Sequence, residues 1–121
     1  MTNTTPLVIA RGISGSIPVL TLCGRLTLGE GSRALRRSLE EVAAEGHKHV
    51  LLDLTEVSYV DSSGLGALVA GYNSLKARAG TVGLFGVPAR VQELLDLSRL
   101  TTIFRVFNSQ GEAEKYFADG A

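Results

Sequence analysis

Two neighbouring serines, Ser62 and Ser63, stand between Asp61 and Gly64 in the middle of the sequence. A serine hydroxyl can accept a phosphate group, which adds about −1.5 to −2 charges at neutral pH. The position suits this modification, because residues 61–62 fall where a helix is expected to begin, and a helix start favours negative charge. The same residues also describe an ordinary capped turn, so local chemistry leaves both interpretations open.

The segments on either side of this turn must position the two hydroxyls. Residues 50–54 are almost wholly apolar, which predicts a short strand buried on both faces of a parallel sheet, followed by turn-prone residues. Residues 63–79 carry apolar side chains at helical spacing, and Gly80 follows as a helix stop. The serines are therefore expected at the junction of a buried strand and a helix.

The rest of the sequence alternates strand and helix patterns without a linker that would divide it. Its 121 residues, 45% of them hydrophobic, suffice for one domain with a continuous core. The expected strands cover residues 7–13, 18–25, 50–54, 81–87 and 104–107, and the expected helices cover residues 29–45, 63–79, a short stretch opened by Pro88, and 110–117. This order predicts an α/β fold with a mixed sheet, parallel through its middle and covered by helices.

No complete catalytic motif is found. Residues 64–66 resemble a dinucleotide-binding turn, but Val69 occupies the place of the third glycine. Neither serine lies in a Gly-x-Ser-x-Gly motif, and no glycine-rich turn is followed by the Walker lysine. Asp53 near a strand end is expected to be structural, because the other residues of a phosphate-accepting receiver are missing. The sequence predicts no enzymatic activity and no cofactor.

Composition also narrows the classes of partner. Twelve basic and twelve acidic residues cancel, and few aromatic residues are available to stack on bases, which argues against nucleic acid. The longest apolar runs fall short of the roughly 18 residues that a membrane span needs, so we expect no membrane insertion and a cytoplasmic location. The single cysteine, Cys23, fits a reducing compartment and is expected to be a small core residue.

His47 and His49 are the only histidines and flank Lys48. A metal site needs more ligands than these two, and no third candidate lies nearby in the sequence. We therefore expect solvated loop histidines and no metal site.

Residues 50–71, in which a buried strand leads to Asp-Ser-Ser-Gly-Leu-Gly, resemble the signature of the STAS domain of bacterial anti-sigma factor antagonists. Residues 19–26, 83–87, 91–95 and 104–107 are similar to further family segments in the same order. The resemblance covers about residues 7–117 of a single domain that spans residues 1–121. It implies the STAS fold, with a mixed central sheet of about five strands flanked by about four helices.

The resemblance implies a protein-binding switch. In such families the unphosphorylated antagonist sequesters an anti-sigma factor that is itself a serine kinase of the GHKL type. Phosphorylation at the first serine after the aspartate, here Ser62 with Ser63 as the alternative, breaks the complex, and a serine phosphatase restores it. The implied partner interface comprises Asp61, Ser62, Ser63, Gly64, Leu65, Gly66, Gly24, Arg25 and Thr27.

One segment departs from the family pattern. Many members carry Gly-Glu-Leu-Asp where this chain has Gly24-Arg25-Leu26-Thr27, so the local field becomes more positive and Arg25 is a candidate contact for a phosphate on Ser62. Gly64 and Gly66 fit close helix packing and close partner approach equally well. Three alternative functions remain: a non-phosphorylated STAS adaptor subunit in a lipid-transport or multi-protein signalling assembly, a small enzyme, and direct nucleotide binding by the domain itself.

Overall fold

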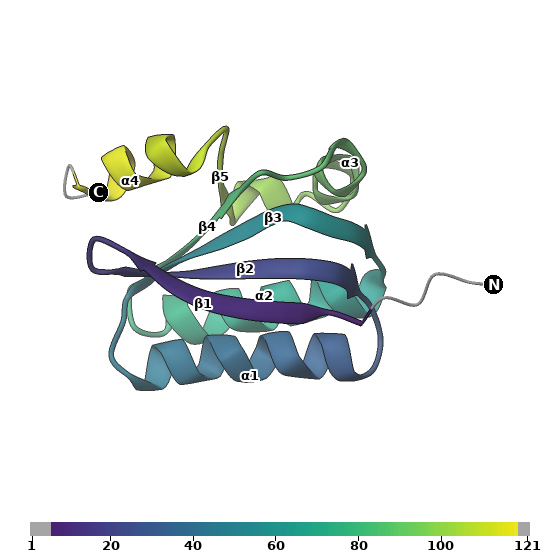
Figure 1. The fold of residues 1–121 in the computed structure, drawn as a ribbon, viewed down its shortest axis with the longest axis horizontal. Coiled ribbons are helices and arrows are strands. Elements are labelled where there is room, and N and C mark those ends of the chain that lie inside the picture. Colours follow the sequence, from purple (N-terminus) through teal and green to yellow (C-terminus); the bar gives the residue numbers. More distant parts are fainter. Residues whose placement is uncertain (1–5, 119–121) are drawn as a thin grey trace.

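A single sheet forms the centre of the molecule in the computed structural model, which describes residues 6–118 (Figure 1). β1 and β2 form an antiparallel hairpin, and β2, β3, β4 and β5 pair in parallel. The predicted mixed sheet is therefore confirmed. The strands lie side by side in chain order: β1 (Val8–Ser14), β2 (Ile17–Leu26), β3 (His49–Val60), β4 (Thr81–Phe85) and β5 (Arg105–Phe107).

The helices are divided between the two faces of the sheet. α1 (Glu30–Ala44) and α2 (Ser62–Lys76) lie side by side beneath it in Figure 1, while α4 (Gln110–Ala118) lies on the opposite side. α3 (Ala89–Leu97) follows β4, and the short 3₁₀ helix η1 (Leu100–Thr102) leads into β5. The apolar spacing in α1 and α2 explains their position, because their apolar stripes turn toward the sheet.

The core has two unequal parts. The larger part lies between the sheet and helices α1, α2 and α3, and the smaller part lies under α4 around Leu51, Phe85 and Phe107. Because α4 is short, it covers only one end of its face. Cys23 lies beyond this cover and is exposed. The expectation that Cys23 is a core residue is therefore wrong.

β3 is much longer than the sequence indicated. It continues past the expected end at Leu54 to Val60, and it stays paired with β2 through the pair Leu26 and Val60. The register between β2 and β3 shifts twice in this region, so apolar residues do not alternate regularly along residues 55–60. For this reason the sequence of residues 55–60 resembles a turn more than a strand. β4 pairs with β3 only as far as Asp53, so the last part of β3 extends beyond β4.

His49, at the start of β3, packs against the terminal helix. Its ring centroid lies 5.0 Å from that of Phe117, and burial, with a smaller effect of the charge on Lys48, lowers the pKa of His49. The expectation of a solvated loop histidine is therefore wrong for His49. Within residues 6–118, no group of three or more potential metal ligands is found.

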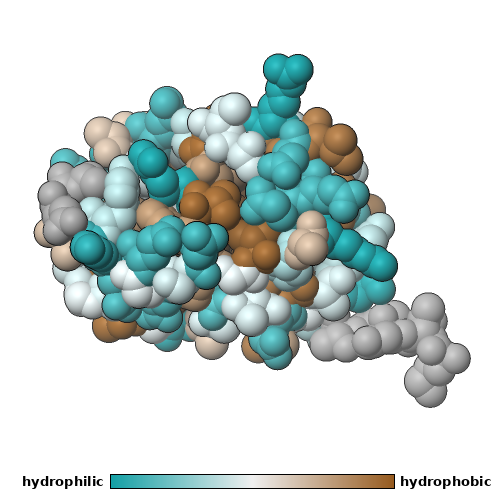
Figure 2. All heavy atoms as spheres, turned by 90° about the horizontal axis from the view of Figure 1, so that it is seen from above, coloured by the Kyte–Doolittle hydropathy of each residue, from teal (hydrophilic) through white to brown (hydrophobic). Residues whose placement is uncertain are grey.

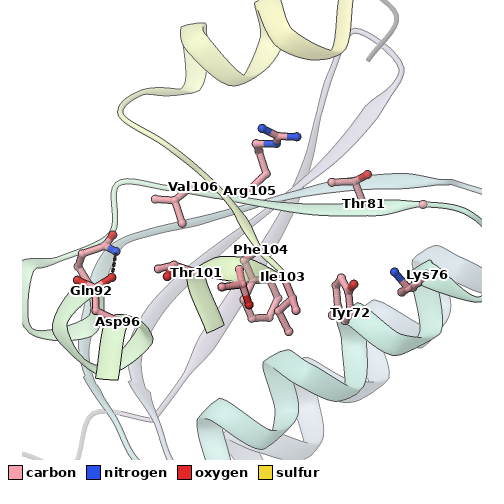
Figure 3. Close-up of a pocket in the computed structure, with 12 residues that line it drawn as sticks. Tyr72, Lys76, Thr81, Gln92, Asp96, Thr101, Ile103, Phe104, Arg105 and Val106 are labelled. Carbon is pink, nitrogen blue, oxygen red and sulfur yellow. Dashed lines mark hydrogen bonds between the residues drawn. The ribbon is translucent and has the colours of Figure 1, made fainter. Parts of the chain in front are cut away.

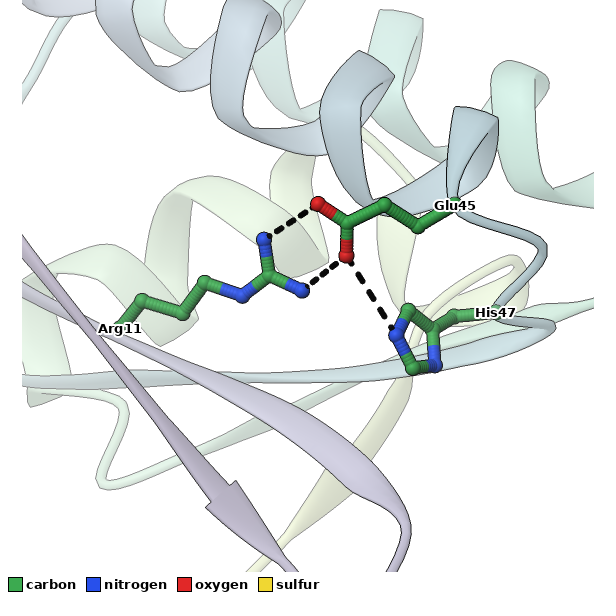
Figure 4. A network of polar contacts seen from close by, with 3 residues as sticks. All are labelled: Arg11, Glu45 and His47. Carbon is green, nitrogen blue, oxygen red and sulfur yellow. Dashed lines mark hydrogen bonds and ion pairs between the residues drawn. The ribbon is translucent and has the colours of Figure 1, made fainter.

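A polar cluster ties the edge strand β1 to the end of α1 (Figure 4). Arg11 donates two hydrogen bonds to the Glu45 carboxylate, and the His47 ring lies 3.5 Å from the same carboxylate. The hydrogen bond from Arg11 lowers the pKa of Glu45 and so favours its charged form. The cluster places opposite charges along an otherwise open strand edge.

Candidate functional site

Asp61 is the residue that organises the turn between β3 and α2. It has an extended backbone conformation at the N-cap position, and its Oδ1 accepts a hydrogen bond from the Gly64 amide at 2.8 Å. Its Oδ2 accepts from the Leu28 amide at 3.0 Å, in the loop that joins β2 to α1. One carboxylate therefore caps α2 and also holds the neighbouring loop.

These contacts set the electrostatics of the turn. Partial burial by itself raises the pKa of Asp61, but hydrogen bonds from the backbone amides of Gly64, Leu28 and Ser63 outweigh it and lower the pKa below its ordinary value. Asp61 is consequently ionised at neutral pH. At the start of α2, the Gly64 amide is already bonded to this carboxylate, and the Ser63 amide lies close enough to lower its pKa.

The two serines differ in accessibility. Ser62 is the first residue of α2 and is exposed, whereas Ser63 is half-buried. Leu65, one turn later, is half-buried and packs against the main core. Of the two hydroxyls, that of Ser62 is the more accessible to an enzyme that would modify it.

The two glycines of the turn also differ. A Cβ on Gly64 would lie 2.2 Å from the carbonyl oxygen of Leu26, so close packing of α2 on β2 requires glycine there. A Cβ on Gly66 would meet only the end of the Arg36 side chain, at 3.6 Å, which is an ordinary contact. Close packing therefore accounts for Gly64 and leaves Gly66 without a packing requirement.

The end of β2 lies beside this turn. Gly24 and Arg25 pair with Val57 and Tyr59 of β3, and Gly24 is buried with a φ of 115°. The guanidinium of Arg25 lies over the ring of Tyr59, 4.9 Å from its centroid. Thr27 is half-buried, and its carbonyl accepts from the amide and hydroxyl of Ser32. The contact of Arg25 with a phosphate on Ser62 stays a prediction.

Leu28 and Tyr59 complete this end of the molecule, and the sequence analysis did not single them out. Leu28 is 79% exposed although its amide is held by Asp61, and Tyr59 is 44% exposed. The sequence signal that could have indicated Leu28 as a candidate site residue is that it is an apolar residue in an otherwise polar loop. The sequence did not indicate Tyr59 as a strand residue at this site, because the strand was expected to end at residue 54.

A separate hollow lies at the other end of the sheet, around the first residues of β4 and β5 (Figure 3). It measures about 690 Å³ and is lined by polar side chains such as Lys76 and Thr81. In Figure 3, Gln92 donates to Asp96 on α3, while Arg105 points toward α4. This hollow contains none of the residues of the Asp61 turn.

The order of strands and the two helix layers define an α/β fold in which the candidate residues gather on two adjoining loops at one end of the sheet. The chain belongs to the STAS domain family, whose model matches residues 9–113. The expected family and fold are thus confirmed. Within the described residues, no helix is long and apolar enough to cross a membrane.

Named relatives agree with this assignment. An anti-sigma-B factor antagonist of Listeria monocytogenes is 43% identical over 61 residues, which make up 50% of this chain and 54% of that protein. The chain thus spans about half the length of the curated relatives it matches.

Solved structures share the fold. An anti-sigma-factor antagonist (STAS) domain protein from Planctomyces limnophilus has a TM-score of 0.81 at 20% identity, over 91% of this chain and 97% of that chain. The Bacillus cell fate determinant SpoIIAA in its phosphorylated form has a TM-score of 0.71 at 17% identity, over 90% and 99%.

Proposed function

We propose that this chain is an anti-sigma factor antagonist that sequesters an anti-sigma factor until Ser62 is phosphorylated. The observation that carries the proposal is the exposed Ser62 hydroxyl on the first residue of α2, directly after the capping Asp61, in a STAS domain. A relative named as an anti-sigma-B factor antagonist supports the class of partner.

A phosphate on Ser62 would act mainly on the surface. Because the Asp61 carboxylate already takes the amides of Gly64 and Leu28, the phosphate remains outside this hydrogen-bonded turn. It places about −1.5 to −2 charges next to an ionised aspartate. A partner surface that fits a neutral hydroxyl is then opposed by desolvation and repulsion, and the complex dissociates.

The partners in this proposal are an anti-sigma factor that is a serine kinase of the GHKL type, and a serine phosphatase that reverses the modification. The kinase, which binds ATP and magnesium, catalyses the phosphorylation. The antagonist is its substrate and carries out no catalysis of its own. All three proteins would act in the cytoplasm.

The direct test is phosphorylation by the GHKL-type serine kinases of the organism that encodes this chain. Wild type, Ser62→Ala and Ser63→Ala are incubated with each kinase, ATP and magnesium, and intact mass and peptide position are measured. We expect one phosphate on wild type and on Ser63→Ala, and none on Ser62→Ala. Phosphate on Ser62→Ala but not on Ser63→Ala would move the acceptor by one residue. No phosphate on any variant would favour the adaptor function instead.

Binding provides the second measurement. Ser62→Ala is expected to bind the kinase persistently in the presence of ATP, whereas Ser62→Asp is expected to bind more weakly than wild type. Equal affinity of wild type and Ser62→Asp, measured by calorimetry without ATP, would argue against control at Ser62.

A further inference from the structure

An arginine of α1 reaches across to the beginning of α2. The two helices start at the same end of the sheet and pack side by side (Figure 1). Arg36 is exposed, and one terminal nitrogen of its guanidinium lies 3.6 Å from the position that a Cβ on Gly66 would take. Its charged end therefore lies over the first turns of α2.

The position over Gly66 is close to the candidate phosphoacceptor. Ser62 precedes Gly66 by four residues in the same helix. Residues three and four apart are neighbours on a helix surface, with Cβ atoms about 5–6 Å apart. A phosphate on Ser62 extends beyond the hydroxyl and adds three acceptor oxygens. Rotation of the Arg36 side chain, without movement of the backbone, brings its guanidinium to these oxygens.

The donors of Arg36 are available to a phosphate. Among residues 6–118, Arg36 makes no ion pair and no hydrogen bond from its side chain. Glu40 lies one turn later on α1, at a spacing that suits an ion pair, yet the guanidinium turns toward α2 instead. By contrast, Arg25, the cation that the sequence suggested, already lies over the ring of Tyr59.

On this side of the sheet, α1 supplies nearly all the charge. α1 carries three arginines and three glutamates, whereas α2 carries one charged residue, Lys76, in its last turn. Figure 2 shows the opposite face of the molecule, where hydrophobic side chains gather within a hydrophilic surround. A phosphate at the start of α2 therefore finds its counter-charge on α1.

Arginine binds phosphate through two parallel N–H donors, which gives a strong charge-assisted contact. We propose that Arg36 binds the phosphate of phosphorylated Ser62 and leaves its place over Gly66. This inference rests on the proposed function and adds to its regulation. Phosphorylation then moves a cation as well as adding negative charge, so the anti-sigma factor meets two changes on the surface that it would contact.

The second pKa of the phosphate measures this contact, because a nearby cation lowers it and a nearby carboxylate raises it. Several other charges surround the turn and Arg36, so the comparison must change position 36 alone. These other charged residues are Asp61, Glu30, Glu40, Arg25, Arg33 and Arg37.

The test places phosphoserine at position 62 by genetic-code expansion, so that no kinase is needed. The second pKa of the phosphate is measured by ³¹P NMR. Arg36→Gln is expected to raise it by about 0.3–0.7 units, the range of an exposed ion pair. Arg36→Lys should restore part of the difference, since lysine keeps the charge without the paired donors.

The matched control is Arg37→Gln. It removes the next arginine of α1, which is also exposed but points about 100° further around the helix, and it is expected to leave the pKa nearly unchanged. Thermal unfolding checks that all variants fold. In the phosphorylated protein, the Arg36 Nε–H signal in the NMR spectrum should shift with the same midpoint as the phosphate.

Two results would overturn the inference. An equal pKa with and without Arg36 shows that the guanidinium does not hold the phosphate, and it leaves the proposed function standing. A pKa that rises in Arg25→Gln but not in Arg36→Gln assigns the contact to Arg25 instead. Failure of kinases to modify Ser62 counts against the proposed function, and it does not alter this titration because the phosphate is installed directly.

Discussion

The two helices on the same face, α1 and α2, begin at the same end of the sheet in different ways. α1 starts after Gly29, so no side chain caps the amides of its first turn. Gly29 has a φ of 106° and open space around it. α2 starts after Asp61, whose carboxylate holds two amides, and Gly64 lies tightly against β2. The candidate phosphoacceptor therefore sits on the more firmly fixed start, where an added charge alters the surface more than the fold.

The steric part of this difference gives the largest expected effect. Gly64→Ala is expected to lower the free energy of unfolding by about 1–3 kcal/mol, because the added Cβ meets the backbone of Leu26. Gly66→Ala is the matched control, and it is expected to change stability by less than about 1 kcal/mol, since alanine favours a helix and its Cβ has room. Urea unfolding measures both, and equal losses would remove the steric distinction.

The hydrogen bonds that distinguish the start of α2 from the start of α1 are tested at Asp61. Asp61→Ala is expected to cost about 1 kcal/mol of stability and to speed hydrogen exchange of the Leu28 amide, because both the cap and the loop contact are lost. Asp61→Asn should cost less, since asparagine is an equally good cap and only one side-chain oxygen is lost. If exchange at Leu28 is unchanged in both variants, the carboxylate does not hold the loop.

The acid dependence of stability sharpens the same point. The pKa of Asp61 is lowered in the folded state from its ordinary value of 3.8, so its stabilising effect is present above that value. This effect is lost as the pH falls through the lower folded-state value. The stability advantage of wild type over Asp61→Asn, measured by urea unfolding from pH 7 to pH 2, should therefore shrink in the acid range. An advantage that is constant with pH would contradict an ionised cap.

The smallest effect is expected at Ser62 itself. Ser62→Asp should change the free energy of unfolding by no more than about 0.5 kcal/mol, because the side chain is exposed and the nearby Gly64 amide is already bonded to Asp61. Thermal unfolding measures this. A large loss of stability would mean that a charge at Ser62 destabilises the folded state. It would contradict the inference that an added charge there alters the surface more than the fold.

Local patterns in the sequence predicted the order of elements and the capping position of Asp61 well. Helical spacing and cap residues are local signals, so they survive in the sequence. The long β3 was missed because its irregular pairing with β2 replaces strict alternation, and the pairing is a property of two segments.

Other features depended on distant parts of the chain. Cys23 is exposed because α4 is too short to cover its end of the sheet, and His49 is half-buried because Phe117 packs on it. An apolar pocket between the end of β3 and α3 arises from the unequal lengths of β3 and β4. None of these could be read from the residues near the site, since each is set by a contact between elements far apart in sequence.

The Arg11–Glu45 pair on β1 has a consequence for handling the protein in solution. β1 is the outermost strand, with Val8 and Ile13 exposed along it, and such an edge is a template for pairing with another molecule. A charged residue in its middle discourages this association. Protonation of Glu45 in strong acid breaks the ion pair, but the Arg11 guanidinium keeps its charge, so this obstacle to edge-to-edge association persists in acid.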